Sequence, residues 1–275
     1  MDNLAAITKS VTEVCKKAGA FLMEQFQNFD TRLVEYKGIN DVVSYVDKEA
    51  EKLLIAGLKE ILPTAAFITE EGTLNKYEMG FIPQEGLYWL IDPLDGTTNF
   101  IHGLPVFAVS VGLWHNGQLI AGCVYEPNRD ECFYAWDGGG AWLNGNTIKV
   151  SDTENLGESL LATGFPFAEF SKMTEYLSIL NKLMQSSHGL RRMGSAAVDL
   201  AYVASGRFQG FFEYNLKPWD VAAGAIIVKE AGGTVTDFRG GTDFVFGKEI
   251  VAAGKIHQPM QELIKQFWVS GPIKY

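Results

Sequence analysis

Cysteine and positive charge are both scarce in this sequence of 275 residues. The three cysteines, Cys15, Cys123 and Cys132, form no C-x-x-C pair, which argues against a disulfide framework and against a zinc knuckle. The net charge of −10 argues against nucleic acid as a partner, because binding to a phosphate backbone needs clustered Lys and Arg. An acidic protein can still bind a phosphate ester if metal ions reverse the local field.

Long hydrophobic runs are also missing, so no segment is expected to span a bilayer. The N-terminal segment lacks the continuous apolar core of a signal peptide and has the spacing of an amphipathic helix instead. The cysteines are expected to be buried small hydrophobes. Together these features predict a soluble cytoplasmic protein with no membrane partner.

Apolar residues at helical spacing predict two N-terminal helices. Hydrophobic residues make up 47% of the chain and charged residues 20%, which are values of a globular protein rather than a disordered one. The second helix is expected from about Ser44 to Leu62, where Pro63 helps to end it. Its inward residues are expected to be Val46, Ala50, Leu53, Leu54, Leu58 and Ile61.

The rest of the chain divides into two patterns. From Leu87 to Val150, short apolar strands alternate with turns, and the pairs Asn116-Gly117 and Asn144-Gly145 are hairpin signals that favour antiparallel pairing. After a polar stretch at 151–159, strands and helices alternate, which indicates a mixed α/β arrangement. We therefore expect an N-terminal α+β lobe (1–150) with an antiparallel sheet and a C-terminal α/β lobe (151–275), joined in one compact catalytic unit.

The segment that carries most chemical information is Asp92-Pro-Leu-Asp95-Gly-Thr-Thr. An apolar strand ends there in two carboxylates, which are the hard oxygen ligands that divalent cations prefer. Gly96 lets the backbone approach an anion, and the amides after it can open a short helix that binds phosphate. An ordinary turn is an equally good interpretation of this segment taken alone, because Pro, Asp and Gly are turn formers.

Three further acidic features help to decide between a metal site and an ordinary turn. Glu70 and Glu71 follow a short predicted strand, where a carboxylate can face a cleft. Asp220 opens a predicted helix and Asp47 completes a Ser44-x-x-Asp47 capping box, so both can be helix caps. The functional alternative for Asp47 is a carboxylate that accepts a proton from an attacking water.

With these motifs in place, the chain resembles the inositol monophosphatase family of Mg²⁺-dependent, lithium-sensitive phosphatases. The resemblance runs almost from end to end. It is carried by Gly38-x-Asn-Asp-x-Val-Ser-x-Val-Asp47, Phe67-Ile-Thr-Glu70-Glu71, Leu90-Ile-Asp92-Pro-Leu-Asp95-Gly-Thr-Thr-Asn-Phe100, Asn144-Gly145, Arg191-Arg-x-Gly194-Ser-Ala196-Ala, Trp219-Asp220-x-Ala-Ala-Gly224 and Glu230-Ala-Gly-Gly233.

The resemblance implies a site with two to three Mg²⁺ ions. Glu70, Asp92 and the Leu94 carbonyl would hold the first ion, and Asp92, Asp95 and Asp220 the second. Glu70 would also reach a third ion through water. Clustered carboxylates repel one another and raise their pKa values, so bound cations explain why such a cluster is present.

The resemblance also assigns the groups that act on the substrate. Thr97 with Asp47 would orient and deprotonate the attacking water, and the amides of Gly96 and Thr97 would bind the phosphate, with Asp95 and Asp220 also facing the substrate. The alcohol portion would meet Gly194, Ser195, Ala196 and Glu213, while Lys37 would give electrostatic support and Arg191-Arg192 could serve either phosphate or a subunit interface.

The implied fold is the layered αβαβα sandwich of the sugar-phosphatase type, in the α+β and α/β classes, and the implied activity is hydrolysis of myo-inositol monophosphate with inhibition by Li⁺. A homodimer is expected. Alternative substrates within the superfamily are fructose 1,6-bisphosphate, histidinol phosphate and 3′-phosphoadenosine 5′-phosphate. An alternative of another class is a regulatory binding protein with secondary phosphatase activity.

Overall fold

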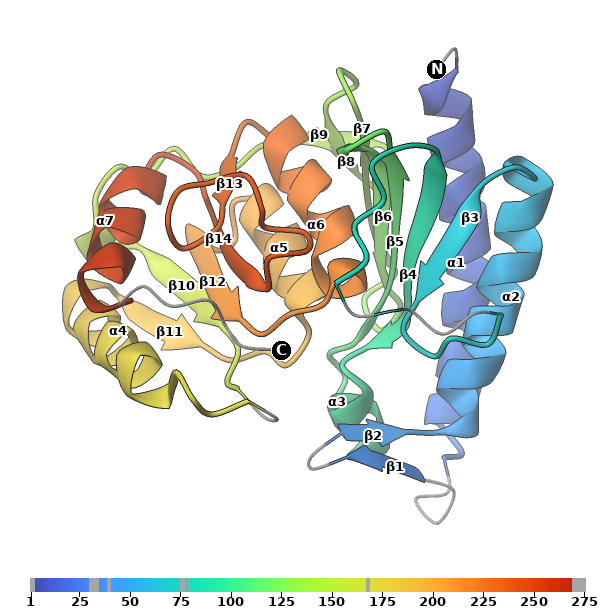
Figure 1. Cartoon of the computed structure of the whole chain (residues 1–275), viewed down its shortest axis with the longest axis horizontal. Helices are drawn as coiled ribbons and strands as arrows, with labels where there is room; N and C mark the ends of the chain where they lie inside the picture. The colour runs from blue at the N-terminus through green and yellow to red at the C-terminus, as the bar shows by residue number, and fades with distance from the viewer. Residues whose placement is uncertain are drawn as a thin grey trace.

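The chain folds into alternating layers of helix and sheet (Figure 1). The computed structural model describes residues 3–29, 35–38, 41–74, 78, 80–166 and 169–268, with only the backbone described for 35–38 and 41–43. From the N-terminal side the layers are a helix pair, a seven-stranded sheet, a second helix pair, a five-stranded sheet and a third helix pair. This order confirms the αβαβα architecture expected from the sequence.

The seven-stranded sheet follows chain order from β3 to β9. The pair β3–β4 is parallel and the other pairs are antiparallel. Asn116-Gly117 and Asn144-Gly145 have positive φ at both residues, as the predicted two-residue hairpins require. The strands are β3 (Ala66–Thr69), β4 (Leu87–Asp95), β5 (Ala108–His115), β6 (Gln118–Glu126), β7 (Glu131–Trp136), β8 (Ala141–Leu143) and β9 (Asn146–Ile148).

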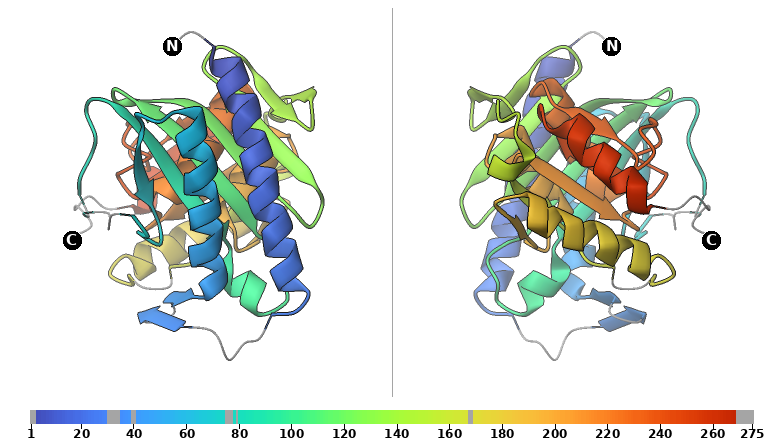
Figure 2. Two further views of the ribbon diagram at one scale, coloured as in Figure 1. Left: turned by 90° about the vertical axis from the view of Figure 1, so that its right-hand side faces the viewer. Right: turned by 90° about the vertical axis from the view of Figure 1, so that its left-hand side faces the viewer.

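Two helices, α1 (Leu4–Phe26) and α2 (Tyr45–Ile61), lie side by side on the outer face of this sheet (Figure 2). The backbone of a small ribbon, β1 (Glu35–Gly38) and β2 (Asp41–Val43), precedes α2. Leu53 was expected to face inward, and this is wrong: it is 47% exposed. The buried stripe of α2 repeats every four residues, at Val46, Ala50, Leu54 and Leu58, and Leu53 lies on its flank.

The five-stranded sheet has the order β11-β10-β12-β14-β13, covered on its outer face by α4 (Met173–Ser186) and α7 (His257–Phe267) (Figure 2). No helix was expected from the sequence at α7. Its Pro259 lies in the first turn, where the missing N–H costs little. The strands are β10 (Leu160–Thr163), β11 (Gly189–Arg191), β12 (Gly210–Tyr214), β13 (Thr234–Thr236) and β14 (Glu249–Ala253), with a 3₁₀ turn at Leu156–Glu158 before β10.

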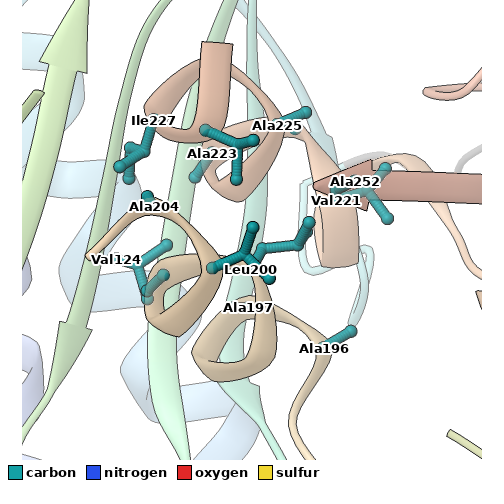
Figure 3. Packing of buried hydrophobic residues seen from close by; sticks show 14 of the residues in the cluster. Val124, Ala196, Ala197, Leu200, Ala204, Val221, Ala223, Ala225, Ile227 and Ala252 are labelled. Atoms are coloured by element: carbon teal, nitrogen blue, oxygen red, sulfur yellow. The ribbon is translucent and has the colours of Figure 1, made fainter. Parts of the chain in front are cut away.

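The middle layer, α5 (Ala196–Ala204) and α6 (Pro218–Glu230), packs against the larger sheet (Figure 3). Gly112 of β5 and Gly122 of β6 face each other across the strand pair, and both lie under α6. A Cβ atom at Gly122 would come within 2.8 Å of the Ala223 Cα. The two glycines therefore let α6 approach β5 and β6, and this close approach helps to set the place of Asp220 relative to the end of β4.

Gly122→Val is expected to destabilise the fold by about 3 kcal/mol, because the added side chain must displace the α6 backbone. Urea unfolding measures this as a lower midpoint. Thr147→Val, at an exposed position of β9, is the control for a valine placed in the same sheet where no helix of the described chain covers it closely. An unchanged midpoint in the Gly122 variant would contradict the close packing of α6.

Among the described residues, all three cysteines are buried and reduced, as expected. No helix in this part of the chain combines the length and apolar character needed to cross a membrane.

Candidate active site

The four predicted acidic ligands meet where the larger sheet ends beside α6. Asp92 and Asp95 end β4, and Glu70 directly follows β3. Because β3 and β4 are parallel, their carboxyl ends lie at one edge, and the Glu70 N–H donates to the Ile91 carbonyl at 3.1 Å. Asp220 reaches the same place from the first turn of α6.

Burial and mutual repulsion shape the electrostatics of this cluster. Burial is the largest cause that raises the pKa of Asp95 to about 6 and that of Asp220 to about 7. The pKa of Asp92 is raised well above its ordinary value by burial and then by the charges of Glu70, Asp95 and Asp220. These carboxyls therefore carry a cost when ionised that a nearby cation would remove.

The donor set fits a hard divalent cation, since all the groups present are carboxyl or carbonyl oxygens. The Asp92 carboxyl lies close enough to Glu70, Asp95 and Asp220 for their charges to favour its protonated form. Among the described residues, no three acidic, His or Cys side chains already surround one point as ligands would. Proton and cation would thus compete for the same oxygens.

Asp47 and Thr97 form the second part of the site. The Thr97 hydroxyl lies 2.9 Å from Asp47 Oδ1 and 3.0 Å from the Leu94 carbonyl. Asp47 is fully buried, and its Oδ2 accepts hydrogen bonds from the Ser44 N–H and hydroxyl. Burial raises the pKa of Asp47, and the bonds from Ser44 and Thr97 oppose that rise.

Both helix-cap interpretations are confirmed by this geometry. Asp47 completes a capping box with Ser44 at the start of α2, and the Asp220 carboxylate accepts the Lys217 N–H at 2.7 Å. Each side chain nevertheless also faces the acidic cluster or Thr97. The cap positions the carboxylate, so the two roles do not exclude each other.

The segment before α5 holds Asp95 from the other side. Asp95 Oδ2 accepts from the Ser195 hydroxyl at 2.7 Å and from the Ala197 N–H at 2.6 Å. Asn99 adds a second link, since its amide donates to the Met193 carbonyl at 2.8 Å. Gly96 has a φ of 99°, and a Cβ there would crowd the Gly194 carbonyl at 3.2 Å. The predicted residues Gly194, Ser195 and Ala196 therefore lie against the Asp95-Gly96 turn.

Glu213 lies on β12, buried, and charges on Asp220 and Asp95 act on it. Burial raises its pKa to about 8, although the charge of Arg192 opposes this. A Cβ at Gly164 would lie 1.9 Å from Glu213 Oε1, so only glycine leaves room for this carboxylate. The guanidinium of Arg192 stacks 5.9 Å from the ring centre of the exposed Phe165.

Asp199, on α5, is a buried acid that the sequence analysis did not single out. Its Oδ1 accepts no hydrogen bond within the described part of the chain. Burial, and then the charges of Glu213 and Asp95, raise its pKa well above the ordinary value of 3.8. A carboxyl whose pKa is raised in the folded state adds stability below its unfolded pKa, and that stability is lost as pH rises.

Asp199→Asn is therefore expected to leave stability near that of the parent protein at about pH 4. At about pH 8 the variant should be more stable by about 1 to 3 kcal/mol, because no buried charge has to form. Chemical denaturation without added metal at a series of pH values measures this difference. A constant difference between the proteins across the pH range would contradict it.

Sequence reasoning missed three polar residues that the structure places around the site: Glu51, Asn99 and Asp199. Glu51 carried a usable signal, since it follows Asp47 by four residues on the buried face of α2. Asn99 lay inside a recognised motif but had no partner that could be inferred from sequence. The side chain of Lys37, proposed for electrostatic support, lies outside the described residues.

Comparison with known proteins gives this arrangement a context. A family model described as the inositol monophosphatase family matches residues 3–271. Nus factor SuhB of Escherichia coli is 44% identical over 238 residues, covering 86% of this chain and 87% of SuhB. The solved structure of extragenic suppressor protein suhB from Bartonella henselae is similar at a TM-score of 0.87 and 39% identity, covering 95% of this chain and 99% of that one. An inositol monophosphatase from Anabaena gives 0.83 and 35%, covering 98% of both chains.

Proposed function

We propose that this chain, which belongs to the inositol monophosphatase family, is a Mg²⁺-dependent phosphomonoesterase that hydrolyses myo-inositol monophosphate to inositol and phosphate. One observation carries the proposal. The carboxyls of buried Asp92 and of half-buried Asp95 and Asp220 act on one another electrostatically, next to the hydrogen bond between Asp47 and Thr97.

Two to three Mg²⁺ ions would be held by Glu70, Asp92, the Leu94 carbonyl, Asp95 and Asp220. When bound, Mg²⁺ polarises phosphoryl oxygens, lowers the pKa of water and stabilises a leaving alkoxide. The raised pKa values of Asp95 and Asp220 favour this assignment, because a bound cation offsets the cost of ionising these carboxyls away from water and, for Asp220, also relieves the repulsion from Asp95.

The chain's own groups then divide the remaining work. Thr97 accepts a hydrogen bond from the attacking water and donates its own hydroxyl proton to Asp47 Oδ1, which is 2.9 Å away. When the water gives its proton to Thr97 Oγ1, the Asp47 carboxylate takes the proton that Thr97 held. The backbone amides of Gly96 and Thr97 bind the phosphate. Asp95 is held by Ser195 and Ala197, so its free oxygen keeps one orientation during the reaction.

Glu213 supports a polyhydroxylated alcohol as the leaving group. Its carboxyl group has a space kept open by Gly164 and lies near Asp95 and Asp220. Hydroxyls of a cyclitol can donate to such an acceptor, with Gly194, Ser195 and Ala196 lining the same end. The alternatives fructose 1,6-bisphosphate, histidinol phosphate and 3′-phosphoadenosine 5′-phosphate would each bring a second charged group or a base.

A second candidate function comes from the names of the relatives. Several proteins at 42–44% identity are named Nus factor SuhB, so a regulatory role with secondary phosphatase activity is the second proposal. The net charge of −10 makes a protein a more suitable direct partner than nucleic acid. We further propose that the protein is a homodimer and acts in the cytoplasm.

A phosphate-release assay over a substrate panel separates these proposals. With Mg²⁺, myo-inositol 1-phosphate should be hydrolysed faster than fructose 1,6-bisphosphate, histidinol phosphate or 3′-phosphoadenosine 5′-phosphate, and Li⁺ should inhibit. Faster phosphate release from one of the other three esters would identify that ester, instead of myo-inositol 1-phosphate, as the substrate. If no ester is hydrolysed although Mg²⁺ still binds, hydrolysis is rejected and the regulatory role is favoured.

A further inference from the structure

Glu51 is a fully buried carboxylate on α2 that binds one short segment. This segment, residues 70–73, follows β3 and is called the acidic loop below. Glu51 Oε2 accepts the Glu71 N–H at 2.8 Å. Its Oε1 accepts the Thr73 N–H at 2.7 Å and the Thr73 hydroxyl at 2.6 Å. Three short charge-assisted hydrogen bonds compensate for the burial of this carboxylate.

The acidic loop is also fixed on its other side. The Glu70 N–H donates to the carbonyl of Ile91, the residue before Asp92, which continues the parallel pairing of β3 with β4. The Gly72 N–H donates to Thr69 Oγ1 at 3.2 Å. Glu70 thus lies between an anchor on the sheet and an anchor on α2, so that its carboxyl meets Asp92.

The anchor on α2 is shared with the water-activating pair. Asp47 and Glu51 are four residues apart, so they lie one turn from each other on the same face of the helix, and both are fully buried. Asp47 reaches Thr97, and Glu51 reaches the acidic loop. One rigid element therefore sets the position of two parts of the site that are distant in sequence.

We propose that Glu51 is a positioning residue of the metal site. By tying the acidic loop to α2, it holds Glu70 beside Asp92 and in register with Asp47 and Thr97. This inference rests on the proposed function for the role of Glu70 as a ligand. A purely structural role for Glu51 would lower the stability of the protein but leave its affinity for Mg²⁺ unchanged.

Glu51→Gln in the full chain tests the proposal. The amide oxygen can still accept from one side, but the NH₂ group meets an N–H donor on the other, which loosens the acidic loop. The Mg²⁺ dissociation constant, measured by calorimetry, is expected to rise about tenfold. The Mg²⁺ concentration for half-maximal phosphate release should rise equally, while kcat at saturating Mg²⁺ stays within about twofold.

Two further variants control this experiment. Glu49→Gln changes an exposed acid on the same helix that is bonded only locally, to Lys52, and should behave like the parent protein. Thr73→Val removes one of the three donors and should raise the dissociation constant less than Glu51→Gln does. If the Glu51 variant does not fold, Thr73→Val decides the question.

An unchanged Mg²⁺ dissociation constant in folded Glu51→Gln, or in Thr73→Val when that variant decides, would overturn the positioning role. A lower kcat at saturating Mg²⁺ with unchanged Mg²⁺ affinity would overturn it as well. Weaker Mg²⁺ binding in Glu51→Gln, together with no turnover by the parent protein on any ester, would support the positioning role and reject the proposed hydrolysis.

Discussion

Asp95→Asn is expected to lower Mg²⁺-dependent phosphate release by about a thousandfold or more while the protein stays folded. The amide oxygen can take the place of Oδ2 and keep the bonds from the Ser195 hydroxyl and the Ala197 N–H. The NH₂ group then replaces the oxygen available to a cation, and it cannot act as a ligand. The substitution removes the proposed ligand with little change to the surrounding structure.

Initial rates at saturating substrate and a series of Mg²⁺ concentrations measure this loss, and circular dichroism checks the fold. Asp152→Asn is a matched control, because Asp152 is an exposed aspartate whose ion-pair partner is Lys149. Full activity in Asp95→Asn would remove this residue from the metal site.

Asp47→Asn is expected to lower kcat by at least about a hundredfold with little change in Mg²⁺ affinity. Asp47 accepts hydrogen bonds on both oxygens, from Thr97 on one and from Ser44 on the other. An amide must turn its NH₂ group toward one of these donors. The variant therefore loses the proton acceptor or the cap that orients it.

Thr97→Val should produce a similar loss, because it removes the hydroxyl that links Asp47 to the attacking water. If the two residues act as one unit, the double variant is not much slower than either single variant. Thr97→Ser, which keeps the hydroxyl, should retain most of the rate. Losses that multiply in the double variant would show that Asp47 and Thr97 act separately.

Much of the fold was predictable because its signals are local. The apolar spacing predicted α1 and α2, and the two Asn-Gly pairs predicted hairpins that the structure confirms. The failures have local causes too. Leu53 lies at the edge of an apolar stripe, and α7 contains a proline in its first turn.

The position of α6 between the sheets is not a local property. It depends on Gly112 and Gly122, which look like ordinary strand glycines in the sequence but together make room for Ala222 and Ala223. The lobe boundary at about residue 150 stays a prediction. The chain passes from the seven-stranded sheet to the five-stranded sheet between β9 and β10.

The acidic residues of the site were predictable from motif chemistry, but the residues that hold them in place were not. Asp92, Asp95, Asp220 and Glu70 were chosen by residue type and motif, and the structure brings them together. Glu51 binds the backbone N–H groups of Glu71 and Thr73, and Asn99 binds the Met193 carbonyl. Contacts to backbone groups cannot be predicted from residue type, because every residue carries such groups. The alcohol side is least determined, since Glu213 fits several hydroxylated molecules.

The most direct test of a carboxylate-bound Mg²⁺ site is phosphate release from myo-inositol 1-phosphate as Mg²⁺ is titrated, with the parent protein and Asp220→Asn measured side by side. We expect release by the parent protein to rise from zero in chelator to a saturating rate, and release by the variant to stay at background across the titration. Equal, Mg²⁺-independent rates in the two proteins would contradict the account.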